Sequence, residues 1–549
     1  MKFRLKLFTV AATALTLGSS LTGFAGATKA ATLAADSKQH VNVMESSDLV
    51  TLDPSKAQDL ASFDALTNSM EGLYRVGKDQ KVVPGLATSV VTPTNDGKTY
   101  TFTLRKDAKW SDGTPVTAKD FVYSWRRTVN PKTKAGYSYI FDNVVNAQEI
   151  MDGKKSPDTL GVKADNDYQL TVNLTRATPY FKYLLAFGTY FPENEKAVKK
   201  YGSSYGTTAA KAVYNGPFQL KGWNGTNNKW TLAKSKDYWD ASNVHLNKLT
   251  VQVVKEPSTA LNLFQNHNLD DAILSGEMAK QEAKKPTYVA NKQAQIGYLD
   301  FNFKHKVTAN ANVRKAISLV MNRKQLTKNV LSDGSVAAEG FVPAKFATNP
   351  QTNVDFTKDT YTKAAVTADK TQAKQLWKQG LKQLGKKHVK LTLLTSDVDS
   401  MKKVGAYVQS AIEQELPGAK VTVSSLPYKT YQTRMEDGSN DIVLARWIGD
   451  YPDPATFMQL KTPGTVYNYG QYNNKTYADA VNKANTTDAN DPQARYNDFV
   501  TAEKQLMNDQ AVSPLFQASD THLRNQNFKG VVYHQTGAPY DYKWAYVTK

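Results

Sequence analysis

The sequence contains no cysteine, and after its first 30 residues it has no apolar run as long as about 18 residues. The lack of cysteine excludes disulfides, thiolate metal ligands, cysteine nucleophiles and anchoring through an acylated cysteine. The lack of long apolar runs argues against a membrane-spanning helix in the body of the chain. The seven histidines are dispersed without H-E-x-x-H or a similar spacing, so we expect no metal site.

Signatures of catalysis and nucleotide binding are also scarce. Neither G-x-x-x-x-G-K nor G-x-G-x-x-G occurs, so the chain is not expected to hydrolyse ATP itself. Gly202 to Gly206 fits the G-x-S-x-G pattern, but it follows a charged stretch, whereas a nucleophile elbow follows a buried strand. We therefore predict a protein that is not an enzyme and has no cofactor, and ligand capture suits it better than chemistry.

Length and charge set the broad class. A chain of 549 residues is too long for one core, so two or three domains are expected. The formal net charge is +19, but lysines occur in every segment and form no stripe of the kind that binds nucleic acid. The charge predicts either loose attraction to anionic polymers or lipid headgroups of a cell envelope, or simply a basic soluble surface.

The N-terminus has the pattern of a secretory signal. Lys2, Arg4 and Lys6 precede a mostly apolar stretch from Leu7 to Leu21, and small residues suitable for cleavage follow at 25–27 and 29–31. We predict that residues 1–30 are a signal peptide and that the mature protein is exported and soluble.

Alternating patterns in the C-terminal half predict an α/β unit. Residues 441–448 form a continuous apolar run that ends at Gly449, before two prolines, as a buried strand does. The predicted order is strand 389–394, helix 401–416, strand 420–426, helix 428–436 and strand 441–448. Strands joined by helical crossovers are parallel, and ligands bind beyond their carboxyl ends. Asp450 lies at such an end.

Two aspartates after this strand have different explanations. Asp453 precedes Pro454 and a helical pattern, which indicates an N-cap with a structural role. No such structural role is indicated for Asp450. It could face a cationic group of a ligand, or it could be a solvated turn residue that bonds to its own backbone.

Further elements follow from periodicity and turn signals. The segment 102–125 predicts a strand, a turn at Asp112-Gly113 and a helix that opens with a capping box, Thr117 with Asp120. A second α/β pattern lies in the middle of the chain. The other predicted strands are 41–43, 87–91, 99–104, 249–254 and 270–274, with a hairpin turn at 95–98, and the other predicted helices are 63–73, 313–330 and 371–384.

Four segments together resemble one known family. They are 102–125, Tyr214 to Phe218, Val313 to Arg323 and Trp447 to Pro454. In order and spacing they are similar to the extracellular solute-binding proteins of peptide ABC importers, the oligopeptide- and dipeptide-binding family. The resemblance covers essentially the whole mature chain.

The resemblance implies an α/β fold of the periplasmic-binding-protein type, with two lobes joined by crossing strands and an extra subdomain. The crossings are expected at 298–303 and 513–516. Lobe I is expected to comprise 31–70, 186–297 and 513–549, the extra subdomain 71–185, and lobe II 298–512. The protein is expected to be a monomer on the outer face of the cell membrane, in the cell wall or in the periplasm.

The resemblance also implies a function and a site. Family members enclose an oligopeptide and deliver it to a membrane permease; a nickel chelate, a sugar or a signalling peptide is the alternative solute. Asp450 matches the aspartate that accepts the peptide α-ammonium group. Backbone pairing is implied at Arg446 to Ile448 and at Gln58 to Leu60. The implied peptide-binding residues are Asp450, Trp447, Arg446, Ile448, Gln58, Leu60, Tyr123, Tyr298, Tyr428 and Arg434.

The chain also departs from the family pattern. Leu444 stands where oligopeptide binders often have an arginine, Tyr428 stands where a tryptophan is common, and no histidine aligns near Ser400. These differences bear on how the carboxyl end of the peptide is recognised and therefore on its length.

Overall fold

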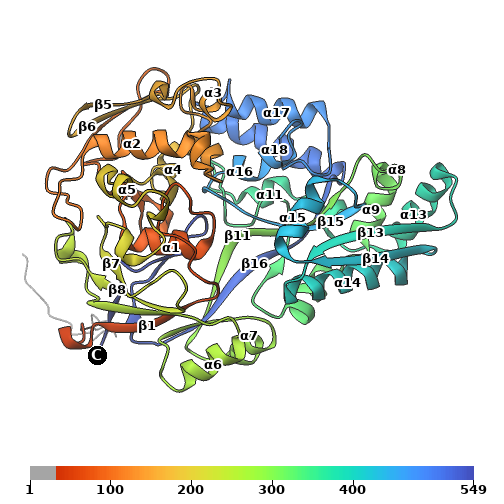
Figure 1. Cartoon of the computed structure of the whole chain (residues 1–549). Helices are drawn as coiled ribbons and strands as arrows, with labels where there is room; N and C mark the ends of the chain where they lie inside the picture. The colour runs from red at the N-terminus through yellow and green to blue at the C-terminus, as the bar shows by residue number, and fades with distance from the viewer. Residues whose placement is uncertain (1–31, 466) are drawn as a thin grey trace, which may run out of the picture.

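The computed structural model describes residues 32–465 and 467–549, with all of their side chains except those of Asp79, Tyr428 and Lys429. The predicted signal peptide lies outside these residues. The described chain forms two bodies, which are joined in the middle by the long strands β11 (Tyr288–Phe301) and β16 (Val512–Arg524) (Figure 1). Within the described part, no helix combines the length and the apolar character that a membrane crossing requires.

The first body contains a four-stranded sheet with the order β1-β9-β8-β7. Val41 and Val43 of β1 alternate with exposed residues and pack on Leu249 and Val251 of the parallel strand β9, as period-two patterns require. The predicted strands at 41–43 and 249–254 are therefore confirmed. The strands are β1 (His40–Glu45), β7 (Phe218–Lys221), β8 (Lys229–Lys234) and β9 (Lys248–Val253).

A separate subdomain covers this body and has its own sheet, of order β4-β6-β5. Helix α2 (Ala118–Val129) packs on it through Phe121 and Trp125, and the predicted capping box is present, because the Asp120 carboxylate accepts from the Thr117 N–H at 2.7 Å. The predicted strand at 87–91 is wrong: only Ala87 forms a bridge, to Leu104. The other elements are β4 (Thr99–Thr103), β5 (Val162–Asn166), β6 (Gln169–Asn173), α3 (Ala147–Met151), α4 (Phe181–Leu184) and α5 (Glu195–Tyr201).

The second body is built on a mixed sheet of order β10-β16-β11-β15-β13-β14. β13 (Val389–Ser396) is parallel to β14 (Ala419–Leu426) and to β15 (Ile442–Ile448), with α14 (Asp399–Glu415) and α15 (Tyr428–Glu436) as crossovers. The predicted strand–helix alternation is therefore confirmed. Because parallel strands end on the same edge, Ser396 and Ile448 open on one cleft.

β11 and β16 connect the two bodies. β11 pairs with β16 in both of its halves, and from Gln295 onward it also pairs with β15 along its other edge. β10 (Asp271–Leu274) pairs with the last part of β16. Register shifts between Lys292 and Ile296 and at Gly297 interrupt this ladder. Irregularities of this kind bend a strand locally. Here they lie in the part of β11 that connects the two bodies.

Helices cover the second body. The predicted helix at 371–384 is confirmed as α13 (Lys370–Leu384), which packs on α9 (Ala311–Leu319). The predicted helix at 313–330 is interrupted, because the Asn322 side chain caps a new turn by accepting from the Gln325 N–H. The remaining helices are α1 (Leu60–Ser69), α6 (Pro257–Gln265), α7 (Gly276–Glu282), α8 (Lys306–Ala309), α10 (Arg323–Gln325), α11 (Phe356–Thr360), α12 (Lys363–Val366), α16 (Ala455–Met458), α17 (Lys475–Asn485) and α18 (Pro492–Asn508).

Candidate functional site

The candidate site is a cleft of about 260 Å³ at the end of β15. β15 contributes its last residues and Asp450, and β11 contributes Gln295 and Tyr298. Tyr137 of the extra subdomain faces them across the cleft. The other lining residues are Ser396, Met401, Tyr431, Gln432, Met435, Leu444, Ala445, Arg446, Trp447, Ile448, Leu460, Tyr467 and Tyr469.

Asp450 is the only acidic residue among those lining this cleft. Its backbone N–H donates to Thr456 Oγ1 at 3.1 Å, and its Oδ2 accepts from the Tyr139 hydroxyl at 3.1 Å. Among the described residues, no lysine, arginine or histidine forms an ion pair with it. Burial raises the pKa of Asp450 to about 7, and the Tyr139 hydrogen bond lowers it in part. The site therefore holds a half-buried carboxyl group, and no cation among the described residues stabilises its ionised form.

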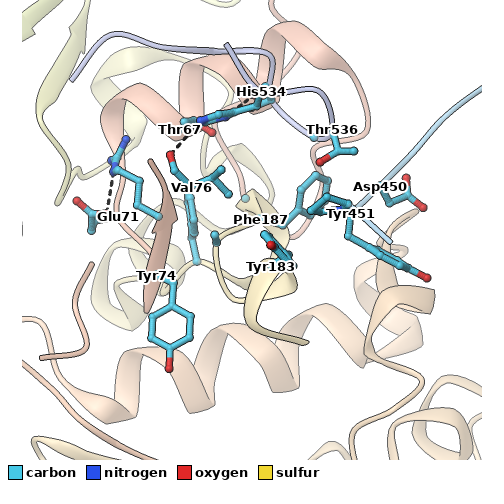
Figure 2. Close-up of a pocket in the computed structure, with 17 residues that line it drawn as sticks. Thr67, Glu71, Tyr74, Val76, Tyr183, Phe187, Asp450, Tyr451, His534 and Thr536 are labelled. Atoms are coloured by element: carbon cyan, nitrogen blue, oxygen red, sulfur yellow. Dashed lines mark hydrogen bonds and ion pairs between the residues drawn. The ribbon is translucent and has the colours of Figure 1, made fainter. Parts of the chain in front are cut away.

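A second, smaller pocket of about 30 Å³ lies on the other side of Asp450. Figure 2 shows Asp450 and Tyr451 at one side of this pocket and Glu71 at the opposite side. Glu71 pairs with the buried Arg75 at 2.9 Å, and Arg75 also contacts Asp541. The negative charge of Glu71 is thus compensated within the protein, whereas that of Asp450 is not.

Aromatic side chains form much of the cleft wall. Trp447 and Tyr467 have ring centroids 5.0 Å apart, and Tyr467 meets Tyr139 edge-on at 6.1 Å. The Trp447 Nε1–H is buried and has no hydrogen-bond partner among the described residues. Aromatic faces and an unsatisfied donor suit a ligand that offers both apolar groups and acceptors.

The backbone of β15 also faces the cleft. The Gly449 N–H bonds to the Ala294 carbonyl of β11, and alternation in an antiparallel ladder then directs the backbone groups of Trp447 to β11 and those of Arg446 and Ile448 to the opposite side. On that side, the described ladder with β13 includes only Ile442 and Val443. The Leu444 carbonyl there accepts from the Tyr431 hydroxyl at 2.9 Å.

The structure brings five of the predicted residues together in this cleft: Asp450, Trp447, Arg446, Ile448 and Tyr298. Tyr298 is buried, with the Lys461 ammonium 5.5 Å from its ring centre. Lys461 is in turn paired with Asp300, so its charge is already compensated.

The other predicted residues lie elsewhere. Gln58 and Leu60 are exposed at the start of α1 and do not line the cleft, although Gln58 lies against Gly136, next to Tyr137. Arg434 pairs with Asp437 and borders a small neighbouring pocket. Tyr123 lines a separate surface hollow on α2 and packs against α5. The side chain of Tyr428 is outside the described residues.

Sequence reasoning missed the partners of Asp450. Tyr139 comes from the extra subdomain and Thr456 from α16. The aromatic run from Tyr137 to Phe141 was a visible signal, but no periodicity assigns it to a cleft. Asp453 has a structural role, as predicted, although α16 begins at Ala455 and Pro454 takes the N-cap position predicted for Asp453. Its carboxylate accepts from the Ala455 N–H at 2.9 Å and makes two 2.7 Å contacts with Arg495.

Two α/β bodies joined by paired strands, with an aromatic cleft between them, define a two-lobed binding protein. Residues 81–469 match the model of the bacterial extracellular solute-binding proteins, family 5, middle region, and the chain belongs to this family.

Known proteins similar to the chain carry names and titles of peptide binders. The dipeptide-binding protein of Lactococcus lactis is 38% identical over 91% of this chain and 93% of its own. The periplasmic murein peptide-binding protein MppA of Escherichia coli is 33% identical over 87% and 88%. The structure of Listeria monocytogenes OppA bound to peptide has a TM-score of 0.80 at 37% identity and covers 93% of this chain and 99% of that chain.

Proposed function

We propose that this protein captures extended oligopeptides between its lobes and delivers them to the membrane permease of an ABC importer. One observation carries the proposal. Asp450, beyond the carboxyl end of β15, is a half-buried carboxyl group without a cationic partner among the described residues. A peptide α-ammonium group supplies that cation and offers up to three N–H donors.

The main chain of the peptide is proposed to pair with β15. Arg446 and Ile448 direct backbone groups toward the cleft, so an extended peptide can be added there as a strand. Main-chain pairing gives affinity without dependence on side chains, and the aromatic wall then tolerates varied residues. Gln58 to Leu60 are proposed as a second segment that pairs with the main chain of the peptide. Tyr123, Tyr428 and Arg434 remain proposed peptide-binding residues.

Lobe closure is proposed to control binding. The cleft is smaller than the ~300–1,000 Å³ of pockets that hold drug-sized ligands, so a peptide of several residues requires the lobes to separate. Contacts between the two parts oppose separation. Among them are the Tyr139 hydroxyl with Asp450, the stacked rings of Tyr180 and Tyr451 with centroids 4.1 Å apart, and Asn490 with the Asp96 carbonyl at 2.9 Å. Ligand contacts made only in the closed form shift the population toward it.

The lobe boundaries are part of the proposal. We assign lobe I to 31–70, 186–297 and 513–549, the extra subdomain to 71–185 and lobe II to 298–512. The proposed hinge is the irregular part of β11 with the adjacent part of β16. The protein is proposed to act as a monomer, without catalysis, at the outer face of the membrane, in the wall or in the periplasm.

Native mass spectrometry of the freshly purified protein tests this function. We expect masses of bound peptides, which are released on denaturation and carry free amino termini. A nickel chelate, a sugar or another non-peptide solute as the bound species, together with no calorimetric response to peptide mixtures, would refute the proposal. Added peptide should also remain uncleaved during long incubation.

A further inference from the structure

A segment of 27 residues in lobe II contains no acidic residue. From Lys370 to Ser396 there is neither Asp nor Glu, while lysine occurs seven times, at positions 370, 374, 378, 382, 386, 387 and 390. We call these seven side chains the lysine row; it is a local exception to the even spread of lysines along the rest of the sequence. The first four lie on α13, the next two follow its C-cap residue Gly385, and the last lies on β13.

All seven lysines are exposed, and they lie away from the peptide cleft. Figure 1 shows α13 at the outer end of lobe II, on the side opposite β11 and β16. Lys370 and Lys374 both contact Glu415, which compensates part of their charge. The other five lysines of the row form no ion pair within the described residues. Lys390 also faces Lys420 directly across the parallel pair β13–β14.

The stability of α13 does not account for the lysine row. Lysine is favourable near a helix C-terminus, which explains Lys382, but Lys370 occupies the first turn, where the helix dipole favours acids. Lys370, Lys374, Lys378 and Lys382 are spaced four residues apart, and like charges at this spacing cost about 0.2–0.5 kcal/mol per pair. An anion bound along this surface would relieve the repulsion.

We propose that the lysine row is a docking surface for a linear phosphate-bearing polyanion, such as an envelope polymer. Four-residue spacing places successive ammonium groups about 6 Å apart along α13. Each step also turns the side chain by about 40° around the helix, so the row winds from one face to the next. A flexible chain can follow a winding row, whereas a flat membrane surface meets only part of it.

The experiment compares two triple variants that remove the same charge. Lys378→Gln, Lys382→Gln and Lys386→Gln interrupt the lysine row, and glutamine preserves helix propensity. Lys221→Gln, Lys229→Gln and Lys248→Gln change exposed lysines of lobe I that form no ion pair within the described residues. Binding of synthetic linear poly(glycerol phosphate) is measured by calorimetry over a series of salt concentrations.

We expect the row variant to bind the polymer at least about tenfold more weakly at low salt and to reduce the salt slope by about 2, since each neutralised phosphate contributes about 0.7 on a single-stranded polyanion. The lobe I variant should stay within about twofold of the wild type. Both variants should retain their circular dichroism and their affinity for peptide.

Equal losses in the two variants would overturn the proposal, because net charge alone would then govern binding. The same variants are tested on vesicles of phosphatidylglycerol. Row-dependent binding to vesicles without row-dependent binding to the polymer would assign the surface to a membrane instead and would equally contradict the proposal.

Discussion

Asp450 and Asp453 lie within one turn after the same strand, yet their surroundings differ. Asp453 makes two 2.7 Å contacts with Arg495 and accepts from the Ala455 N–H. Asp450 receives one hydrogen bond, from the Tyr139 hydroxyl, and no cation of the described residues pairs with it. The structure pairs one carboxylate with an arginine and shows no cation beside the other among the described residues.

The two aspartates also contact different parts of the molecule. Arg495 belongs to α18, so its pair with Asp453 holds the turn against that helix. Tyr139 belongs to the other side of the cleft, so the proposed separation of the lobes would break its contact with Asp450. In the proposed function, the anchoring of Asp453 would hold Asp450, three residues earlier, at the place where a ligand binds.

The largest expected effect is on stability. Asp453→Ala leaves the largely buried Arg495 without its partner and should lower the free energy of unfolding by about 3–5 kcal/mol. Urea denaturation of the ligand-free protein measures this. Asp453→Asn, which keeps the Ala455 acceptor, should lose somewhat less. A change below about 1 kcal/mol would mean that Asp453 does not hold the turn.

The second effect is on affinity. Asp450→Asn should weaken binding of a short peptide by about 3 kcal/mol, roughly a hundredfold, because the α-ammonium group loses its charge partner in a closed cleft. Calorimetric titration measures this loss. Its unfolding free energy should not fall, in contrast to that of Asp453→Ala. A stability loss as large as that of Asp453→Ala would show that Asp450, like Asp453, has a structural role.

The third effect is on pH dependence. The pKa of Asp450 is raised to about 7 by burial, so below pH 7 the carboxyl group must lose a proton before it can hold an ammonium ion. Peptide affinity should fall by up to about tenfold per unit as pH decreases below 7. Affinity measured from pH 5 to pH 8 should follow this course in the wild type and stay nearly flat in Asp450→Asn.

The same raised pKa affects the ligand-free protein with the opposite sign. The folded state holds the proton of Asp450 more tightly than the unfolded chain does, so this stabilising contribution is present below about pH 4 and is lost as pH rises toward 7. Ligand binding and ligand-free stability should therefore respond to Asp450 in opposite directions.

The smallest effect concerns Tyr139. Tyr139→Phe removes the hydroxyl that donates to Asp450 and should change peptide affinity by about 1 kcal/mol. It should also move the midpoint of the affinity profile to higher pH, since the hydrogen bond lowers the pKa of Asp450. A midpoint that does not move would show that the Tyr139 contact does not influence the carboxyl group.

Sequence predicted the parts of this site that depend on local patterns. β13, α14, β14, α15 and β15 follow from periodicity, and Asp453 follows from its place before Pro454. Asp450 at a strand end follows from parallel-sheet topology. The contact with Tyr139 could not be found, because 311 residues separate the two and no local pattern records which faces meet across a cleft.

Elsewhere the predictions failed for identifiable reasons. The strand expected at 87–91 has β-branched residues but forms only one bridge, from Ala87 to Leu104, and β4 pairs with β6 instead. The helix expected at 313–330 has the right apolar spacing, but Asn322 offers a cap that starts a new turn. In both places tertiary pairing or side-chain capping outweighed the periodic pattern.

The most direct test of the account measures a peptide and its N-acetylated form against both the wild type and Asp450→Asn by calorimetry. If Asp450 holds the α-ammonium group, acetylation costs the wild type about a hundredfold in affinity and costs the variant less than about threefold. Equal losses from acetylation in the two proteins would contradict the account, because the leading end of the peptide would then be recognised somewhere other than at Asp450.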